Sequence, residues 1–465
     1  MSQPSPRNFS LDAIVNLCKQ RGFIYQGSEI YGGIAGMFDY GPLGALLKRN
    51  IVSKWVNYFV HGREDMFLID SAILMNQKVW HATGHVDEFV DPLVDDLKTN
   101  KRYRADHLLE DAGIDPTKMT VDEMTQAFVD NKIISPEGNP VGPVRKFNMM
   151  LETKIGAMED SSATSYLRPE TAQGIFVNYK NVVDSFSPKL PFGIAQIGKA
   201  FRNEITPRDF IFRLRELEQM EIEYFFHPDS NWEQIFEMLL QEEKKFLMSL
   251  GIKELSLHVF EHPSEARSHY SKRTVDYEFD FPFGTKELVG LAYRTNYDLT
   301  KHTEHSKTKL TYFDIENNQH VVPHVIEPSF GLDRLFLAIM TDAYEEQDLG
   351  EGNTRNVLHL QKDIAPYLCA VSPLLKNNPE MVAKAQEIYK DIKIKTEGRA
   401  NWEDNSNIGK RYRRQDEIGT PFCVVVDHDT LDVSSENFNT VTVRDRDTML
   451  QVRIAISEVF THISK

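Results

Sequence analysis

The chain has 465 residues, which at roughly 150 residues per domain predicts two or three domains with sizeable cores. Hydrophobic residues make up 41% and charged residues 26%, and no apolar run approaches the about 18 residues of a membrane-spanning helix. The composition therefore predicts a soluble globular protein without a membrane partner. The net charge of -16 argues against a strongly basic nucleic-acid binder, because phosphate contacts need Lys and Arg.

The start of the chain and its cysteines bear on location. The segment MSQPSPRNFSLDA has neither a basic cluster followed by an apolar stretch nor an arginine-rich character, so we expect no export or organelle signal. Three widely spaced cysteines, Cys18, Cys369 and Cys423, fit neither a disulfide framework nor a metal site. We expect a cytoplasmic protein with reduced, structural cysteines.

The first half of the chain predicts a mixed architecture. Residues 41–60 repeat apolar positions at helical spacing after a Pro-Gly signal, which predicts one long amphipathic helix. Residues 91–160 turn polar and irregular and are expected to form an insertion. Between 192 and 228, two strand-like runs flank the polar segment TPRDFIFRLR, which predicts an antiparallel hairpin with a long loop.

The second half continues this pattern and then changes. A helix is predicted over 231–251 and another from Gly331 onward, with strands between them, so residues 1–345 are α+β with an antiparallel sheet flanked by helices. The acidic, glycine-containing segment 346–356 is expected to be a linker. Beyond it, strand and helix patterns alternate, which predicts a small α/β domain over 357–465 with a mainly parallel sheet.

The charge is unevenly distributed between these two parts. Residues 356–465 contain 15 Lys and Arg against 16 Asp and Glu, so this part carries -1 and the remainder about -15. The basic residues of the tail are clustered in Lys410, Arg411, Arg413 and Arg414, beside Tyr412. A solvated helix end explains this run as well as an RNA contact does.

The strongest chemical signal lies in residues 198–226. Arg202 and Glu204 alternate on one face of a predicted strand, and Arg213 follows after the loop. An arginine on a rigid strand can hold a phosphate with its planar fork, and a carboxylate can accept from an amino group. The pattern fits ATP, although an exposed strand face of mixed charge has the same appearance.

A second signal lies in residues 323–340. A predicted strand ends in Glu327, Ser329 and Gly331 and runs into a helix that carries Arg334 on its first turn. Glycine permits close approach of a ligand to the backbone, and the arginine can reach a second phosphate or stack on a base. An ordinary strand-turn-helix explains this segment alone, but the two segments together favour a nucleotide site.

Several motifs here resemble a known family. The segments FRNE, FRLRE and GLDR resemble the second and third signature motifs of class II aminoacyl-tRNA synthetases, and the helix at 41–60 lies where the weaker first motif belongs. YGPLGALLKRN, WHATGHVDEFVDPL, YRADHLLE, LRPETAQGIFVNYKNV and EPSFGLDRL are similar to glycyl-tRNA synthetases of the dimeric type. EGRANWEDNSNIGKRYRRQDEIGTPFCVVVD resembles their anticodon-binding domain, so the resemblance covers nearly the whole chain.

The resemblance implies a class II catalytic domain that activates glycine with ATP, releases pyrophosphate and transfers glycine to the 3' end of tRNA(Gly). It also implies Mg²⁺ with the ATP and a homodimer. A small filled pocket can exclude larger amino acids by overlap, so no editing domain is required. The tail would read unpaired anticodon bases by stacking and hydrogen bonds.

The resemblance also implies roles for individual residues. Arg202, Glu204 and Arg334 form the expected catalytic set, with Arg202 at the α-phosphate and Arg334 at the adenine and γ-phosphate. Glu287 is the expected magnesium ligand. The expected ATP-binding residues are Arg202, Asn203, Glu204, Phe212, Arg213, Leu217, Glu287, Leu288, Gly331 and Arg334; the glycine-binding residues are Arg104, Glu170, Glu218, Glu221, Arg294, Glu327, Ser329 and Gly331; and the tRNA-binding residues are Lys410, Arg411, Arg413 and Arg414.

The sequence departs from the family pattern in places. Leu217 stands where a phenylalanine usually packs against adenine, and the loss of aromatic stacking is worth roughly 0.5 to 1.5 kcal/mol. Thr285 and Lys286 replace a Trp-Gly pair that often precedes the Glu287 position, and Asn296 replaces a common aspartate. The first motif also lacks a clear proline after its helix.

Other patterns in the sequence bear on metal and nucleotide binding. His81 and His85 lie four apart, but Ala82 breaks the HExxH pattern, so we expect no zinc. No GxxxxGK[ST] loop is present. The alternatives are a class II synthetase for proline, threonine, serine or histidine, and a non-catalytic relative such as the accessory subunit of a mitochondrial DNA polymerase. The intact phosphate-clamping residues argue against the latter, and we expect no DNA partner.

Overall fold

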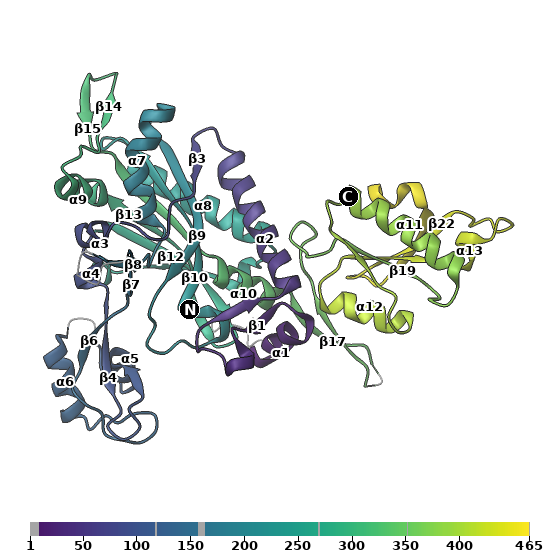
Figure 1. Ribbon diagram of the computed structural model, residues 1–465, viewed down its shortest axis with the longest axis horizontal. Coiled ribbons are helices and arrows are strands. Elements are labelled where there is room, and N and C mark those ends of the chain that lie inside the picture. Colours follow the sequence, from purple (N-terminus) through teal and green to yellow (C-terminus); the bar gives the residue numbers. More distant parts are fainter. Residues whose placement is uncertain (1–8, 117–118, 157–162, 268–269, 351, 465) are drawn as a thin grey trace.

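The computed structural model describes residues 9–116, 119–156, 163–267, 270–350 and 352–464. A larger body built by the first three quarters of the chain lies beside a smaller C-terminal body, and a separate small unit projects from the larger one (Figure 1). None of the helices within these ranges is both long and apolar enough to cross a membrane.

A seven-stranded sheet forms the centre of the larger body. Its strand order is β11-β12-β13-β16-β10-β9-β3, and every neighbouring pair is antiparallel except β3 and β9. This confirms the predicted antiparallel α+β architecture. The strands are β3 (Met66–Ile69), β9 (Phe192–Phe201), β10 (Glu216–Phe226), β11 (Leu257–Glu261), β12 (Arg273–Phe281), β13 (Gly284–Thr295) and β16 (His324–Gly331).

The hairpin predicted between residues 192 and 228 is the pair β9–β10, and β16 lies on the other side of β10. Phe225 is opposite Val325, and Glu221 is opposite Ser329. Side chains alternate between the faces of a strand, so residues two apart share a face. One face of these strands is therefore apolar at one end and acidic at the other.

Helices cover both faces of the sheet. α2, α8 and α10 pack on one face and share its core, whereas α7 and α9 pack on the other. α2 is followed by the π-helical turn η2, so the predicted helix over 41–60 is present with an altered last turn. The helices are α1 (Leu11–Arg21), α2 (Pro42–Val56), η2 (Asn57–His61), α7 (Ala172–Phe186), α8 (Trp232–Ser249), α9 (Tyr297–Ser306) and α10 (Leu332–Ala343).

Shorter elements complete the larger body. β1 and β2 form a hairpin near the N-terminus, β7 pairs with β8, and β14 pairs with β15 in a hairpin that projects at one end (Figure 1). They are β1 (Ile24–Gln26), η1 (Glu29–Tyr31), β2 (Phe38–Tyr40), α3 (Gln77–Ala82), α4 (His85–Glu88), β7 (Leu151–Lys154), β8 (Thr164–Leu167), η4 (Phe210–Phe212), η5 (Glu254–Ser256), η6 (Ser264–Ala266), β14 (Tyr312–Asp314) and β15 (Gln319–Val321).

The projecting unit corresponds to most of the expected insertion. It is more regular than its polar sequence suggested, with a three-stranded sheet of order β5-β4-β6 and a hydrophobic cluster of its own. Residues 151–154 instead pair with 164–167 in the larger body. The elements of the unit are β4 (Val90–Asp95), β5 (Arg102–Arg104), α5 (Ala105–Asp111), α6 (Val121–Asp130) and β6 (Arg145–Asn148).

The C-terminal body has a five-stranded sheet of order β20-β19-β21-β22-β23. The expected mainly parallel sheet is wrong in part: β19 is parallel to β20 and β21, but β22 is antiparallel to β21 and β23. The elements are β19 (Cys369–Pro373), α11 (Pro379–Lys395), β20 (Ala400–Trp402), α12 (Ile408–Glu417), β21 (Phe422–Val426), α13 (His428–Leu431), β22 (Thr440–Asp445), β23 (Gln451–Ala455), η7 (Ile456–Glu458) and α14 (Val459–Ser464).

The segment between the two bodies is also more regular than expected. Residues 346–348 and 354–356 of the expected linker lie in an antiparallel hairpin of β17 (Tyr344–Asp348) and β18 (Thr354–Leu358). β17 follows α10 directly, and β18 packs against α12. The polar composition hid these strands because most of their side chains lie outside a core.

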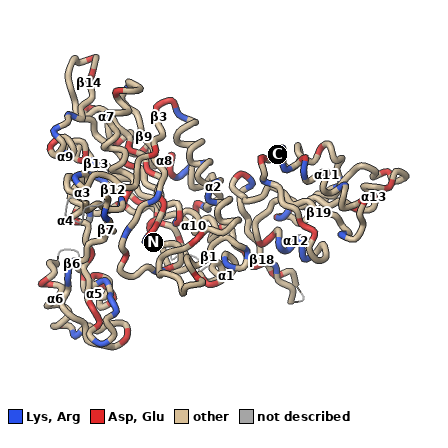
Figure 2. Tube along the Cα trace, in the orientation of Figure 1, with Lys and Arg blue, Asp and Glu red and all other residues tan. Residues whose placement is uncertain are grey.

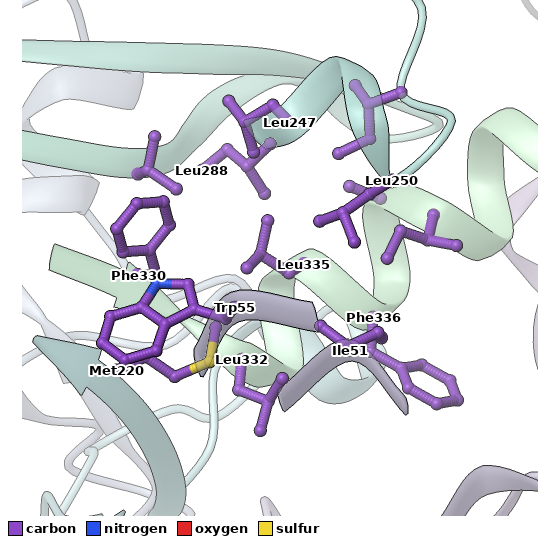
Figure 3. Close-up of a cluster of buried hydrophobic side chains, with 14 of the residues drawn as sticks. Ile51, Trp55, Met220, Leu247, Leu250, Leu288, Phe330, Leu332, Leu335 and Phe336 are labelled. Carbon is purple, nitrogen blue, oxygen red and sulfur yellow. The ribbon is translucent and has the colours of Figure 1, made fainter. Parts of the chain in front are cut away.

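The core between the sheet and the helices α2, α8 and α10 leads to a prediction about stability. Leu335 lies fully buried in the middle of the cluster that includes Trp55 and Phe330 (Figure 3). Leu335→Ala would leave a cavity, and we expect it to lower the free energy of unfolding by about 2 to 5 kcal/mol. Urea denaturation checks this. Leu255 is 92% exposed, so the free energy of unfolding of the Leu255→Ala variant should stay within about 0.5 kcal/mol of the parent value. Equal effects of the two variants would contradict the packing of Leu335.

Candidate active site

The candidate site is a cavity of about 230 Å³ at the acidic end of β10, β13 and β16. It brings together residues from segments up to about 160 positions apart in sequence, including both motifs singled out above. It is lined by Glu170, Arg202, Glu204, Ile211, Phe212, Arg213, Leu214, Leu217, Glu218, Gln219, Glu221, Tyr270, Glu287, Leu288, Arg294, Glu327, Ser329, Gly331, Asp333 and Arg334.

Two of the expected pocket residues do not line this cavity. Arg104 donates to both carboxylate oxygens of Asp106, and its Nη1 donates to Asp91 at 2.6 Å. This arginine is paired with carboxylates of the projecting unit and lies outside the lining, so its expected contact with glycine stays a prediction. Asn203 is absent from the lining and donates from its backbone N–H to Met149 O at 2.8 Å.

One side of the cavity carries the arginines. Arg334 lies over the ring of Phe212, with its guanidinium carbon 4.4 Å from the ring centroid. Its Nη1 is 3.1 Å from Glu287 Oε2. Arg202 donates from Nε to Pro169 O at 3.0 Å, which orients its guanidinium. Two guanidinium groups, that of Arg202 directly after β9 and that of Arg334 on α10, therefore line the same cavity. Phosphate binding requires such converging cations.

Carboxylates accompany these arginines. Glu204 is buried and lies 3.7 Å from Arg213 Nη1. Glu287 is exposed, and the charge of Arg334 lowers the pKa of its carboxyl, so it is ionised at neutral pH. An exposed ionised carboxylate can contribute one oxygen to Mg²⁺, which usually takes one or two protein carboxylates and completes its shell with phosphates and water. No cluster of three metal-binding side chains occurs among the described residues.

The residues that depart from the family pattern differ in their relation to the cavity. Leu217 lines the cavity, and the aromatic surface nearby comes from Phe212, whose ring contacts Phe281 and Phe283 at centroid distances of 5.1 and 5.2 Å. Thr285, Lys286 and Asn296 are outside the lining. Gly331 has φ -79°, so its backbone does not require glycine, but an added Cβ would lie 3.6 Å from the Arg334 side chain.

The other side of the cavity is acidic. Glu221 accepts from Ser329 Oγ at 3.0 Å, from Gln219 Nε2 at 2.9 Å, and from Thr171 Oγ1. Burial raises the pKa of Glu221, and the charge of Glu170 adds to this shift. Figure 2 shows acidic residues along the strands around β9 in this region.

Arg294 is the cation that serves this acidic side. It donates to both carboxylate oxygens of Asp298 at 2.8 and 2.9 Å, and its Nη1 lies 2.9 Å from both oxygens of Glu327. Burial raises the pKa of Glu327 to about 8, and the charges of Glu221 and Glu170 add to the shift although Arg294 opposes it. The guanidinium is thus occupied by protein carboxylates.

Glu170 completes the acidic side. Burial alone would raise the pKa of its carboxyl, but the charge and hydrogen bond of His85, 3.4 Å away, and the charge of Arg294 lower it. Glu218 also lines the cavity, and its carboxylate pairs with Lys48 at 2.6 Å. The cavity therefore offers a cluster of buried carboxylates that interact with one another and with Arg294.

Some residues at the site were missed at the sequence level. Gln219, Tyr270 and Asp333 line the cavity, and Asp333 accepts from the backbone N–H of Glu218 at 2.8 Å. Gln219 and Asp333 lie inside the motifs already quoted, so their positions were available as a signal. Tyr270 lies in no motif, and its ring is 4.2 Å from the Arg294 guanidinium.

The basic cluster of the C-terminal body lies on α12 and its residues differ in exposure. Arg411 is buried, and its guanidinium donates to the backbone carbonyls of Ser406 and Asp404 at 3.0 Å each. These bonds hold Arg411 inside the body, so its side chain is not available at the surface. Arg414 pairs with Glu403 at 2.8 Å. Lys410 and Arg413 are exposed.

Comparison with known proteins agrees with this architecture. Residues 155–344 match a family described as "tRNA synthetase class II core domain (G, H, P, S and T)", and residues 368–465 match an "Anticodon binding domain". With the antiparallel sheet and its cavity, these matches define a class II aminoacyl-tRNA synthetase. Glycine–tRNA ligases of Mycoplasmopsis synoviae and Thermus thermophilus are 47% and 46% identical, covering 96% and 97% of this chain and 97% of each relative. The chain belongs to the glycine–tRNA ligase family.

Other similarities are consistent with this. The glycine–tRNA ligase of Caldanaerobacter subterraneus is 47% identical over 99% of both chains. Among solved structures, a Giardia lamblia prolyl-tRNA synthetase in complex with prolyl-adenylate aligns with a TM-score of 0.65, covering 97% of this chain and 77% of that one. Its sequence identity is only 14%, so this similarity concerns the fold.

A buried acid behind the site is expected to make the stability of the protein depend on pH. Both carboxylate oxygens of Glu223 lack a hydrogen-bond partner in the described part of the chain, and burial raises the pKa of Glu223 well above its ordinary value, with Glu327 adding to the shift. The folded protein therefore keeps this proton to higher pH than the unfolded chain, whose glutamates titrate near about 4.3. This contribution to stability is full below that pH and is lost as the pH rises toward the folded pKa.

Glutamine cannot ionise, so Glu223→Gln should be more stable than the parent by a margin that grows with pH, by at most about 1.4 kcal/mol per unit. Urea denaturation at about pH 5 and about pH 8 measures the margin. Glu233→Gln, at an exposed position, should follow the parent at both. A margin for Glu223→Gln that is the same at the two pH values would show that Glu223 is already ionised.

Proposed function

We propose that this cavity is the active site at which the chain joins glycine to tRNA in two steps. First, a carboxylate oxygen of glycine attacks the α-phosphorus of ATP; an O–P bond forms, and the bond to pyrophosphate breaks. Then the 3'-hydroxyl of the terminal tRNA ribose attacks the acyl carbon, loses its proton, and AMP leaves. The chain is accordingly an ATP-dependent glycine–tRNA ligase.

The observation that carries the proposal is the division of the cavity into two charge zones. Arg202, Arg213 and Arg334 face one part, and buried carboxylates face the other. A polyphosphate and an ammonium group need opposite surroundings, and aligning both substrates in a shared space makes in-line attack effectively unimolecular. A binding protein for nucleic acid alone has no need of the acidic zone.

On the nucleotide side, we assign Arg202 to the α-phosphate and Arg334 to the adenine and γ-phosphate. The support is their contacts: the Arg334 guanidinium lies over the Phe212 ring at the edge of the cavity, and Arg202 is fixed by Pro169 O. Glu204 and Arg213 would place the nucleotide, with Leu217 and Leu288 as apolar walls. Fixed donors stabilise negative charge that develops on the phosphates during attack.

Mg²⁺ is proposed as the cofactor that accompanies ATP, with Glu287 as the protein ligand. Its exposed, ionised carboxylate has the hard oxygen donors that this ion prefers. When bound, the ion would neutralise phosphate charge that otherwise repels an attacking carboxylate. No zinc is proposed.

On the amino-acid side, Glu170, Glu221 and Glu327 are proposed to surround the glycine ammonium, with Ser329 as a neutral partner. Arg294 is proposed to hold Glu327 in place, since its guanidinium is already bound by protein carboxylates. Glu218 and Gly331 would border the site. The cavity of about 230 Å³ is crowded with charged side chains, and overlap excludes larger amino acids without an editing step.

The C-terminal body is proposed to bind the tRNA anticodon, so residues 1–345 would carry catalysis and 357–465 recognition. Lys410 and Arg413 are the proposed contacts, because they are the exposed members of the basic cluster on α12. Figure 2 shows basic residues along this helix. Arg414 would act by shaping this surface through Glu403.

A homodimer and a cytoplasmic location are also proposed. Ile30 and Tyr31 on η1 are 89% and 88% exposed. They lie in the segment that lines, with α2, a hollow of about 750 Å³, and exposed apolar side chains beside a hollow are typical of interaction surfaces. The three cysteines are free and buried, as is usual in a reducing compartment.

Replacement of the phosphate-binding arginines tests the nucleotide side. Arg202→Ala and Arg334→Ala should each lower kcat/KM for glycine-dependent pyrophosphate exchange by about 100- to 1000-fold, because a donor to developing charge is lost. Arg273→Ala serves as a control, since Arg273 pairs with Glu237 and Glu261 away from the cavity; it should keep the parent rate. Normal exchange by either cavity variant would overturn the proposal.

The apolar surface tests the homodimer. Ile30→Asp would bury a charge without a partner in the interface, so sedimentation should show dimers in the parent and monomers in the variant. Leu255→Asp, at another fully exposed position, should remain dimeric. A monomeric parent would reject the homodimer, and a dimeric Ile30→Asp variant would reject this surface.

A further inference from the structure

Gln173 joins two acidic side chains beneath the proposed glycine site. It lies on the first turn of α7 and is fully buried. Its Nε2 donates to Glu170 Oε1 at 3.0 Å and to Asp298 Oδ1 at 2.9 Å. A primary amide has two N–H donors. This neutral group therefore donates both of its hydrogen bonds to carboxylates.

His302 fixes the orientation of this amide. His302 lies on α9, is buried, and has its Nε2 2.8 Å from Gln173 Oε1. An amide oxygen only accepts, so the ring must present its N–H there. Burial lowers the pKa of His302, which favours the neutral ring with its proton on Nε2. A reversed amide would place its oxygen against two carboxylates, so the ring holds the amide in one orientation.

The same amide reaches a second substrate-facing carboxylate indirectly. Asp298 binds Arg294 through two hydrogen bonds, and Arg294 Nη1 lies 2.9 Å from both oxygens of Glu327. Gln173 therefore contacts Glu170 directly and connects to Glu327 through two links. Both carboxylates line the cavity, whereas Gln173, Asp298 and His302 lie outside its lining.

The backbone of α7 leaves Gln173 little freedom. At the next residue, Gly174, an added Cβ would lie 2.0 Å from Ser71 Oγ and 2.8 Å from Gln196 Oε1. The helix therefore packs closely on the chain beside β9. A displacement of the first turn toward the sheet is sterically blocked, so the amide position is set by the fold.

Charge explains why a neutral double donor suits this place. A lysine would add positive charge beneath a site that is proposed to bind an ammonium group, and a glutamate would add a further carboxylate to a cluster already rich in buried carboxylates. A methionine would match the length but leave Glu170 and Asp298 without two hydrogen bonds. Buried carboxylates that lose donors move or take up protons.

We propose that Gln173, held in one orientation by His302, is a positioning residue that fixes Glu170 and, through Asp298 and Arg294, Glu327 for the glycine ammonium. This inference depends on the proposed glycine site. It predicts that the pair sets the affinity for glycine and has little influence on ATP, whose proposed contacts lie on the other side of the cavity.

Pyrophosphate exchange by the full-length chain tests the inference, with KM for glycine, KM for ATP and kcat measured for each variant. Gln173→Met should raise KM for glycine by about 10- to 100-fold, by analogy with the loss of outer-shell partners at metal sites, and change KM for ATP by less than about twofold. Unchanged KM for glycine, or a parallel rise for ATP, would overturn the proposal.

His302 supplies an independent pair of variants. His302→Leu removes the N–H donor and should raise KM for glycine about tenfold, whereas His302→Gln retains a donor and should stay within about threefold of the parent. His302 also lines a cavity of about 390 Å³, which gives room for a differently shaped side chain. A merely structural role would impair both His302 variants and both substrates, and that result would reject positioning.

Two controls separate folding and the underlying proposal from this inference. Asn178→Ala lies on the same helix, and its amide donates to Gly174 O within that helix; it should leave both KM values unchanged. Glu170→Gln and Glu327→Gln should raise KM for glycine. If they do and Gln173→Met does not, only the positioning role fails; if none of these variants changes it, the glycine site itself is wrong.

Discussion

Buried negative charge around Arg294 is the constraint on which the acidic end of the site depends. Glu327 and Asp298 bind this guanidinium directly, and Glu170 and Glu221 lie in the same cluster. Burying unpaired carboxylates is costly, and a guanidinium with a fixed fork can satisfy only some of them. Hydrogen bonds from hydroxyl and amide groups supply the rest. The remaining excess of negative charge is complementary to an ammonium group. The repulsion between carboxylates that destabilises the free protein therefore favours binding of its substrate.

In the central sheet, one part of a strand packs in a hydrophobic core and another part of the same strand carries side chains that face the cavity. The buried charge and the stable core can therefore coexist. On one face, Phe225 and Val325 pack in a core with α7, and a few residues along, Glu221 and Ser329 face the cavity. The rigid antiparallel backbone transmits position from the packed end to the acidic end. A site on strands in this arrangement needs little adjustment when substrates arrive.

Sequence patterns predicted the elements whose formation depends mainly on residues that are close together in the chain. The hairpin around residues 192–228, the helices α8 and α10 and the class of fold follow from periodicity and motifs. The antiparallel β22 and β23 were missed because strand direction is decided by long-range pairing, and the hairpin of β17 and β18 was missed because its strands are polar. Arg411 shows the limit for surfaces: composition marked a basic run, but only the fold reveals which members turn inward.

The same limit applies inside the candidate site. Arg202, Glu287 and Arg334 could be expected to meet because each belongs to a motif whose parts occur in order. Arg104 belongs to a similar motif but is bound by Asp91 and Asp106 in the projecting unit. Behind the cavity, Gln173 lies inside a quoted motif, but its contacts with Asp298 and His302 join positions more than a hundred residues apart, which the sequence pattern does not reveal.

The hairpin of β17 and β18 has a mechanical consequence. A single flexible strand between the two bodies would allow them to swing, and their separation would follow chain statistics. Here the connection runs outward and returns in register, and Arg355 on β18 is anchored 3.4 Å from Asp416 of α12. The hairpin begins and ends beside the larger body, where Tyr344 and Leu358 belong to the same hydrophobic cluster as Ile418 of the C-terminal body. The two bodies are therefore packed against each other, and the entropy of fixing their relative orientation is lost during folding.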